Sequence, residues 1–306
     1  MKIAIIGCGA MGSIYAGLMA SAGNEVWAVD TWKDHVDAIN ANGLRVEGKS
    51  GDRTVKVNAT TDGAKIGVCD LVIVATKADG VAAAAKTALD LTGLETVILT
   101  IQNGLGAADR IAESIPTDQV MIGVVGGFGA SMKGPGHAHH NGMELVRIGE
   151  MNGGESARLV KVVKIWEDSG FTAKGYADID QLIWEKFICN CTFSGPCAIT
   201  GLTVGQVMAS DDAWPIARAC AAEADTVART KGIALGFEDV ETYIRDFGAK
   251  IPNARPSMLL DHMAGRRSEI DAINGAVPRE AGKVGLAAPT NATVAGLIRA
   301  RESGFG

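Results

Sequence analysis

Short apolar runs alternate with helical patterns through the first half of this chain. The apolar runs have the length of β-strands, and they lie at 3–6, 25–29, 71–75, 96–100, 120–125 and 144–148. Stretches that suit helices lie at 11–22, 33–41, 81–91 and 156–169. Strands that are buried on both faces read as continuous apolar runs and alternate with helices. This half therefore predicts an α/β domain with a parallel sheet.

Strand patterns become rare after residue 178. Helical patterns extend over 179–198, 213–231, 237–250, 257–264, 269–283 and 288–302. Gly195-Pro196 should break or bend the first of these helices, because proline donates no backbone hydrogen bond. We therefore expect an α/β domain over residues 1–176 and an all-α domain over residues 177–306.

Length, charge and hydropathy exclude several classes of protein. A chain of 306 residues fits two domains. A net charge of −6 and a pI near 5.4 lack the basic footprint of a nucleic-acid-binding protein. No run approaches the roughly 18 apolar residues that span a bilayer. Glycines interrupt the apolar N-terminus, which favours a buried first strand over a signal peptide. We expect a cytoplasmic protein that binds neither nucleic acid nor membrane.

A glycine motif follows the first predicted strand and opens the first predicted helix. Gly7-Cys8-Gly9-Ala10-Met11-Gly12 matches G-x-G-x-x-G. In this context the first glycine permits a tight turn, the second lets the backbone approach a pyrophosphate, and the third allows close helix–strand packing. The phosphates would lie at the helix N-terminus. The motif predicts a Rossmann-type dinucleotide-binding domain, against the alternative of a turn without a ligand.

The end of the second predicted strand carries a carboxylate, Asp30. At this position a carboxylate accepts hydrogen bonds from both ribose hydroxyls of NAD and repels the 2′-phosphate of NADP. No arginine adjoins it, and Lys33 is the nearest cation. We expect NAD rather than NADP. The alternative is that Asp30 only caps the helix that begins near Lys33.

Six motifs resemble the ketopantoate reductase family (2-dehydropantoate 2-reductases) along nearly the whole chain. They are I-G-C-G-A-M-G at 6–12, A-T-K-A at 75–78, Q-N-G-L-G at 102–106, G-P-G-H-A-H-H-N-G at 134–142, W-E-K-F-I-C-N at 184–190 and S-E-I-D-A-I-N-G at 268–275. The last two are the most specific, because a dinucleotide-binding fold does not demand them. The resemblance implies reduction of a 2-oxo acid to a 2-hydroxy acid with NADPH, in a site between a Rossmann-type domain and a helical domain.

The resemblance also implies roles for residues of the helical domain. Lys186 would be the general acid and Asn190 a substrate contact, while Glu269 would hydrogen-bond the substrate or Lys186. Ser257 would bind the substrate carboxylate. The residues support a lysine in a cleft, because Lys186 lies in an apolar helix where burying a lone ammonium is costly. The alternatives are a lysine that reaches solvent and, for Glu269, a carboxylate that favours a helix N-terminus.

Two further positions follow predicted strands of the sheet. By resemblance, Asn103 would lie near the nicotinamide and contact the substrate, and Lys77 would lie near the cofactor phosphates or ribose. Both positions fit the rule that ligands gather at the carboxyl ends of parallel strands. Each is alternatively a polar loop residue.

The sequence departs from the family pattern at three places. Ser194, which shares a helix face with Lys186 and Asn190 and is expected to contact the substrate, replaces a second asparagine. Serine lacks the paired donor and acceptor of an amide, so ketopantoate itself is in doubt as the substrate. Asp79-Gly80 replaces a glutamine, and Asp30 replaces the basic neighbourhood that NADPH requires. An NAD-linked 2-hydroxy-acid dehydrogenase of the same fold is therefore the alternative reading.

Histidine and cysteine clusters are not expected to carry chemistry. His137, His139 and His140 lack a carboxylate or cysteine partner at convincing spacing, so we expect an exposed or subunit-facing loop and no metal site. His262 is expected at the surface or at the boundary of the core. The six cysteines are scattered without a C-x-x-C pair, which indicates reduced thiols.

Three functions remain open from the sequence. The first is NAD(P)H-dependent reduction of a 2-oxo acid, and the second is oxidation of a D-2-hydroxy acid by NAD with Lys186 as base. The third, from another class, is a dinucleotide sensor without catalysis. Retention of Lys186, Asn190, Ser257 and Glu269 argues against the sensor, which would need none of them. The assembly is left open, with a homodimer as the candidate.

Overall fold

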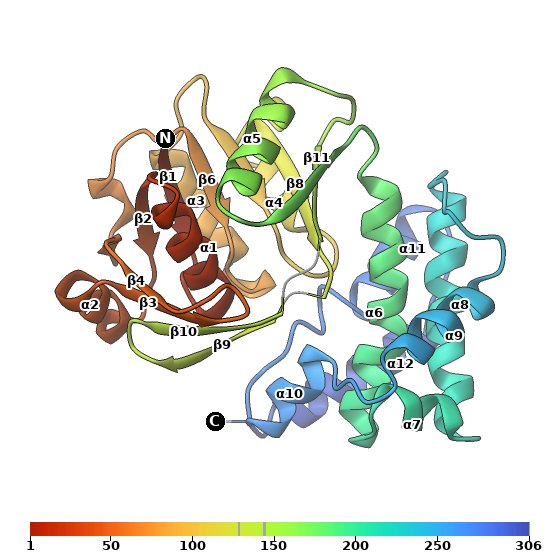
Figure 1. Ribbon diagram of the computed structural model, residues 1–306. Coiled ribbons are helices and arrows are strands. Elements are labelled where there is room, and N and C mark those ends of the chain that lie inside the picture. Colours follow the sequence, from red (N-terminus) through yellow and green to blue (C-terminus); the bar gives the residue numbers. More distant parts are fainter. Residues whose placement is uncertain (128, 143–144, 306) are drawn as a thin grey trace. The chain divides into compact units, whose positions relative to one another are not determined.

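The chain divides into two units of different architecture, shown in the computed structural model of Figure 1. The structure describes residues 1–127, 129–142 and 145–305. The first unit contains Met1–Gln102 and Ala107–Ile179. The second contains Asn103–Gly106 and the chain from Asp180 onward. The expected fold class, an α/β unit followed by a helical one, is confirmed.

A large, mostly parallel sheet forms the centre of the first unit. Its strands are β1 (Lys2–Ile6), β2 (Glu25–Val29), β5 (Asn58–Thr60), β6 (Leu71–Val74), β7 (Val97–Thr100), β8 (Val120–Val125), β11 (Leu145–Glu150) and β12 (Thr172–Tyr176). Their order is β12-β11-β8-β7-β6-β1-β2-β5, with β8 and β11 antiparallel. The apolar runs expected before residue 126 all form strands of this sheet. The last expected run begins at Glu144, which lies outside the described residues.

Helices cover both faces of this sheet, which is why central strands such as β6 and β7 are buried throughout. They are α1 (Ala10–Ser21), α2 (Lys33–Asn42), α3 (Val81–Asp90), α4 (Ala107–Ala112) and α5 (Ala157–Asp168), with short 3₁₀ turns η1 (Gly63–Lys65), η2 (Ala78–Gly80) and η3 (Thr117–Gln119). Alternate residues of β1 enter different cores. Ile3 and Ile5 pack with Tyr15 and Trp166, whereas Ala4 lies in the core beneath α3. Both faces of β1 are thus buried, as a parallel sheet requires.

A second, four-stranded sheet corrects the expectation of a histidine-rich loop. Its strands are β3 (Leu44–Gly48), β4 (Arg53–Val55), β9 (Gly129–Gly134) and β10 (His137–Gly142), in the order β4-β3-β10-β9. His137 and His139 are half-buried and contact Glu47, while His140 is fully buried. The segment is a strand despite its weak β-propensity, because it pairs with β3, far away in the sequence. α1 packs on this sheet, and a Cβ on Gly17 would lie 2.4 Å from Val46 Cγ2.

The described part of the second unit consists of helices and their connections. The helices are α6 (Asp180–Thr200), α7 (Val204–Ala209), α8 (Ala213–Thr230), α9 (Val240–Lys250), α10 (Ser257–Met263), α11 (Ala276–Lys283) and α12 (Pro289–Glu302). Residues 269–275, expected to be helical, form turns before α11. Within the described ranges, no helix combines the length and apolar character that a membrane span requires.

Of the break or bend expected at Gly195-Pro196, the break is wrong. α6 continues through Pro196 to Thr200. Gly195 serves close packing instead, since a Cβ there would lie 2.4 Å from Val294 Cγ1 and 2.7 Å from Asn274 Oδ1. Tertiary packing against α12 therefore offsets the hydrogen bond that proline cannot donate.

Candidate functional site

The glycine loop between β1 and α1 forms the tight turn that its glycines predict. Gly7 has a φ of +89°, and a Cβ there would lie 2.5 Å from the backbone nitrogen of Thr76. A Cβ on Gly12 would lie 2.2 Å from the carbonyl oxygen of Gly7. Gly9 differs, because a Cβ there would meet nothing within 4 Å. The loop is thus closely packed at Gly7 and Gly12 and open at Gly9.

The N-terminus of α1 suits an anionic ligand. Gly9 caps the helix without a side-chain acceptor, and the first turn contains no acidic residue. The first backbone N–H groups of a helix lack intrahelical partners, and the helix dipole favours negative charge beside them. The turn that begins with Ala10 and Met11 therefore fits a pyrophosphate.

Asp30 follows β2 directly, on the same side of the sheet as the glycine loop. Its Oδ1 accepts a hydrogen bond from the backbone N–H of Trp32 at 2.9 Å. Trp32 precedes the first residue of α2, so this bond holds the turn before the helix and does not cap the N–H groups of its first turn. Lys33, the nearest cation in the sequence, forms an ion pair with Asp37 on α2, and both side chains are exposed. This pairing raises the pKa of Lys33 and directs its charge to another carboxylate.

The carboxyl ends of β6 and β7 carry two more polar residues. Lys77 is exposed just beyond β6. Gln102 donates from Nε2 to the carbonyls of Val74 at 2.8 Å and Thr76 at 3.1 Å. The sequence did not single out this residue. Gln102 therefore holds the two strand ends together. Its position next to Asn103 in Q-N-G-L-G could have identified it as part of the site.

The loop Asn103–Gly106 belongs to the helical unit and contacts the predicted general acid. Lys186 Nζ donates to Asn103 Oδ1 at 2.8 Å. Gly104 has a φ of +82°, and a Cβ there would lie 2.1 Å from the carbonyl oxygen of Ala272. The N–H of Leu105 donates to the same carbonyl at 2.9 Å. The loop that carries Asn103 is thus fixed on the turn that begins at Glu269.

The predicted general acid and two predicted substrate contacts lie along one face of α6. Lys186 and Asn190 are half-buried, and Ser194 is 3% exposed. The spacing of four residues places them in a row. Of the remaining predicted contacts, Ser257 is exposed at the start of α10 and Glu269 is half-buried in the turns before α11.

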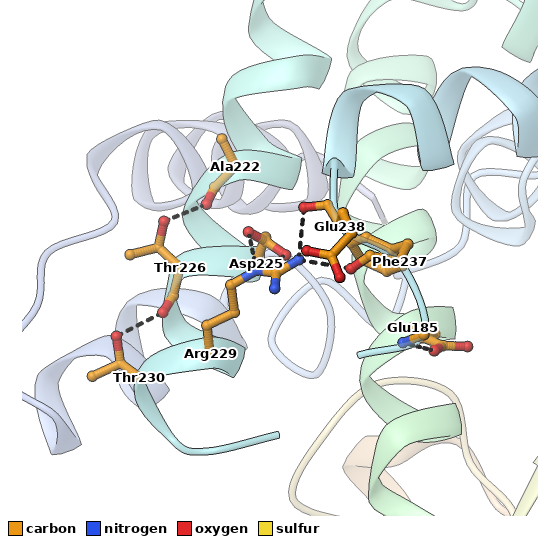
Figure 2. Close-up of polar contacts among 9 residues, drawn as sticks. Glu185, Ala222, Asp225, Thr226, Arg229, Thr230, Phe237 and Glu238 are labelled. Atoms are coloured by element: carbon orange, nitrogen blue, oxygen red, sulfur yellow. Dashed lines mark hydrogen bonds and ion pairs between the residues drawn. The ribbon is translucent and has the colours of Figure 1, made fainter. Parts of the chain in front are cut away.

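Glu185, directly before Lys186, is held by the loop between α8 and α9. Its Oε1 accepts a hydrogen bond from the backbone N–H of Gly236 at 2.8 Å. Figure 2 shows this contact and, on the same loop, Arg229 of α8 donating to the carbonyls of Phe237 and Glu238. These contacts restrain the turn of α6 that carries Lys186.

The position expected for His262 is wrong, because it is buried. His262 Nε2 lies 3.0 Å from Glu302 Oε1, and this oxygen also accepts hydrogen bonds from the backbone N–H and hydroxyl of Ser268 at 2.8 and 2.6 Å. α12 thereby fixes Ser268, the neighbour of Glu269. His262 is buried against Glu302 of α12 and the ring of Phe305, which its own sequence neighbourhood does not reveal.

The cysteines and histidines form no redox or metal centre in the described part of the chain. All six cysteines are free and buried. Burial raises the pKa of the Cys189 thiol to about 12, and the same holds for Cys8, Cys197 and Cys220. Such thiols are poor nucleophiles near neutral pH. No group of three metal-binding side chains occurs among the described residues.

Together, the parallel sheet, the glycine loop, the open helix N-terminus and Asp30 define a dinucleotide-binding protein. The family model described as ketopantoate reductase PanE/ApbA matches residues 3–153, and the model of its C-terminal domain matches residues 178–302. The chain therefore belongs to the ketopantoate reductase family.

Relatives of known name match the chain over almost its full length. The 2-dehydropantoate 2-reductase of Streptococcus pyogenes serotype M3 is 30% identical over 304 residues, which is 99% of this chain and 98% of that protein. The protein of that name from Pyrococcus horikoshii is 32% identical over 305 residues, with 99% and 98% covered.

Two solved structures share the fold of both units. A PanE/ApbA family ketopantoate reductase from Ralstonia eutropha JMP134 aligns with a TM-score of 0.90 and 31% identity, covering 99% of each chain. D-mandelate dehydrogenase, solved with NADH and anilino(oxo)acetate, aligns with a TM-score of 0.90 and 29% identity, covering 100% of this chain and 99% of that one.

Proposed function

We propose that this protein is a nicotinamide-dependent oxidoreductase that reduces a 2-oxo acid to a 2-hydroxy acid. Residues 1–176 would bind the dinucleotide, and residues 177–306 would bind the substrate. Family membership supports the reaction class. The observation that carries the proposal is the half-buried Lys186 ammonium, 2.8 Å from Asn103 Oδ1. We also propose that the enzyme is cytoplasmic. A homodimer is the candidate assembly, and light scattering would test it.

The bound cofactor would supply a hydride to the carbonyl carbon of the substrate. Lys186 neutralises the charge that develops on the carbonyl oxygen and then gives that oxygen a proton. Asn103 orients the ammonium, and Glu269 hydrogen-bonds Lys186 or the substrate. The substrate's polar groups are held by Asn190, Ser194 and Ser257.

The dinucleotide is held by the first unit in this proposal. The glycine loop and the first turn of α1 bind its pyrophosphate through Gly7, Gly9, Ala10, Met11 and Gly12. Lys77, at the carboxyl end of β6, attracts the phosphates or binds the ribose. The open space at Gly9 and the missing side-chain cap on α1 support this placement.

Replacing Asp30 tests the choice between NAD and NADP. We expect the wild-type protein to have the higher kcat/KM with NADH, because Asp30 has an oxygen for the ribose hydroxyls and Lys33 is paired with Asp37. Asp30→Ala should lower the NADH/NADPH ratio of kcat/KM by about 10-fold or more, the worth of a hydrogen bond to a charged group. Asp34→Ala, on α2, is the control. A wild-type preference for NADPH contradicts this reading.

Replacing Ser194 tests the substrate. We expect ketopantoate to be a poorer substrate than another 2-oxo acid, because serine lacks the two-sided hydrogen bonding of asparagine. Ser194→Asn should raise kcat/KM for ketopantoate by about 10-fold, the worth of one good hydrogen bond. Ser194→Ala should leave ketopantoate turnover low. If ketopantoate is the best substrate of the wild-type protein, this prediction is wrong.

Oxidation of a D-2-hydroxy acid with NAD is the second candidate. The similarity to D-mandelate dehydrogenase, solved with NADH, favours it. The same residues would act in reverse, with Lys186 as the base. A steady-state panel of 2-oxo acids with NADH and NADPH, and of D-2-hydroxy acids with NAD, distinguishes the directions. A protein that binds NADH but turns over nothing in either panel would be a sensor.

A further inference from the structure

A buried histidine of the first unit begins a chain of hydrogen bonds that ends in the glycine loop. His35 on α2 is 0% exposed, and its Nε2 lies 3.2 Å from Ser13 Oγ on α1. Ser13 Oγ in turn donates to the carbonyl oxygen of Cys8 at 2.9 Å. Cys8 lies in the loop between Gly7 and Gly9. The chain therefore ends on the backbone that forms the proposed pyrophosphate site.

The second ring nitrogen of His35 determines where the proton lies. The backbone N–H of Gly136 donates to His35 Nδ1 at 2.9 Å, so Nδ1 carries no proton. The proton of the neutral ring is then on Nε2 and is donated to Ser13 Oγ. The Ser13 hydroxyl hydrogen remains for the Cys8 carbonyl. All three hydrogen bonds agree with this one tautomer.

Gly136 and Trp32, which contact the His35 ring, have structural roles of their own. Gly136 has a φ of +69° in the turn between β9 and β10, and a Cβ there would lie 3.1 Å from Ala38 Cβ on α2. One face of the His35 ring stacks on Trp32, with centroids 5.1 Å apart and planes at 13°. The backbone N–H of Trp32 is the donor to Asp30 Oδ1. His35 thus contacts the turn of the small sheet and the residue that holds Asp30.

We propose that His35 is a positioning residue for the dinucleotide, in its neutral form with the proton on Nε2. Through Ser13 it sets the Cys8 carbonyl and the glycine loop, and through Trp32 it sets the turn at Asp30. The turn at Gly136 fixes the ring. This inference rests on the dinucleotide-binding role proposed above, and it adds that acid weakens dinucleotide binding through His35.

Acid has this effect because a second proton changes Nδ1 from acceptor to donor. A protonated Nδ1 would face the N–H of Gly136, so that hydrogen bond is lost. Burial lowers the pKa of His35 from its usual 6.5, and the charge of Asp30 opposes this in part. Cys8, in the glycine loop, adds no charge near His35 because burial raises the pKa of its thiol to about 12. Because the pKa of His35 is lowered, the ring is neutral above about pH 6.5, and its effect on dinucleotide binding appears only as the pH falls below this value toward the lowered pKa.

Isosteric variants separate the two hydrogen bonds of His35. His35→Gln offers a donor near the position of Nε2 and no acceptor at Nδ1, whereas His35→Asn offers the reverse. Ser13→Ala removes the link to Cys8. The dissociation constant for NADH would be measured on the full-length protein by fluorescence titration between about pH 5.5 and about pH 7.5, around the histidine pKa. His140→Gln is the control, because His140 is also buried in this unit and burial lowers its pKa.

We expect the wild-type dissociation constant for NADH to rise about fivefold or more toward acid, which is the worth of one hydrogen bond. His35→Gln, His35→Asn and Ser13→Ala should each weaken NADH binding about fivefold near neutral pH. Both His35 variants should lose the pH dependence, and His140→Gln should keep it. Variants with a lower Tm but wild-type affinity for NADH at both pH values overturn the proposal. A wild-type protein that binds neither NADH nor NADPH contradicts the proposed function instead.

Discussion

Lys186→Ala should lower kcat for the best substrate by about 10²- to 10⁴-fold, the usual contribution of a general acid. Hydride transfer to the carbonyl carbon leaves negative charge on oxygen, and an ammonium held nearby both neutralises and protonates it. The 2.8 Å hydrogen bond to Asn103 fixes Lys186 Nζ before the substrate arrives. The dissociation constant for NADH should change little, because the glycine loop and Asp30 belong to the other unit.

Companion variants separate proton transfer from structure. Lys186→Arg should rescue kcat only in part, because guanidinium releases its proton far less readily than ammonium. Lys250→Ala, an exposed lysine at the end of α9, is the control and should leave kcat unchanged. Glu269→Ala should lower kcat as well, and the double variant should lose less than the product of the single losses if the two residues act together. A folded Lys186→Ala protein with near-normal kcat would rule out the assignment.

Gly12→Ala should damage both stability and cofactor use. Its Cβ would lie 2.2 Å from the carbonyl oxygen of Gly7, a backbone atom that no rotamer change can move away. Either α1 or β1 must shift, and overpacking of this kind costs about 1–3 kcal/mol of the free energy of unfolding. The same shift displaces the N-terminus of α1, so kcat/KM for NADH should fall by about 100-fold, as a 1 Å misplacement does.

Two other glycines provide matched controls for this result. Gly9→Ala has open space for its Cβ, so it should keep the wild-type Tm and weaken NADH binding alone. Gly282→Ala, in α11, also meets nothing within 4 Å and should change neither quantity. The measurements are thermal unfolding and steady-state kinetics with varied NADH. Wild-type stability and kinetics of Gly12→Ala would contradict the close packing at this position.

The local pattern of residues was enough to predict the central strands of the main sheet and its first loop, but not the edge strands β5 and β12. Strands such as Leu71–Val74 are buried on both faces, so every residue in them is apolar and the run is visible in the sequence. The glycine motif was equally readable, because the positive φ of Gly7 and the contact of Gly12 with the Gly7 carbonyl arise within the loop itself. The same holds for Lys186, which stands out as the only lysine in a largely apolar helix. That these residues perform catalysis and binding stays a prediction.

The small sheet, the Lys186–Asn103 contact and the neighbours of His35 were decided by the tertiary structure alone. Asn103 and Lys186 are 83 positions apart, and His35 and Gly136 are 101 apart, so no local pattern links them. His140 belongs to a buried strand because β3 supplies its backbone partners, and α6 continues past Pro196 because α12 packs on it. Propensity describes a segment against solvent, whereas burial and hydrogen bonds from distant segments outweigh it once the chain has closed.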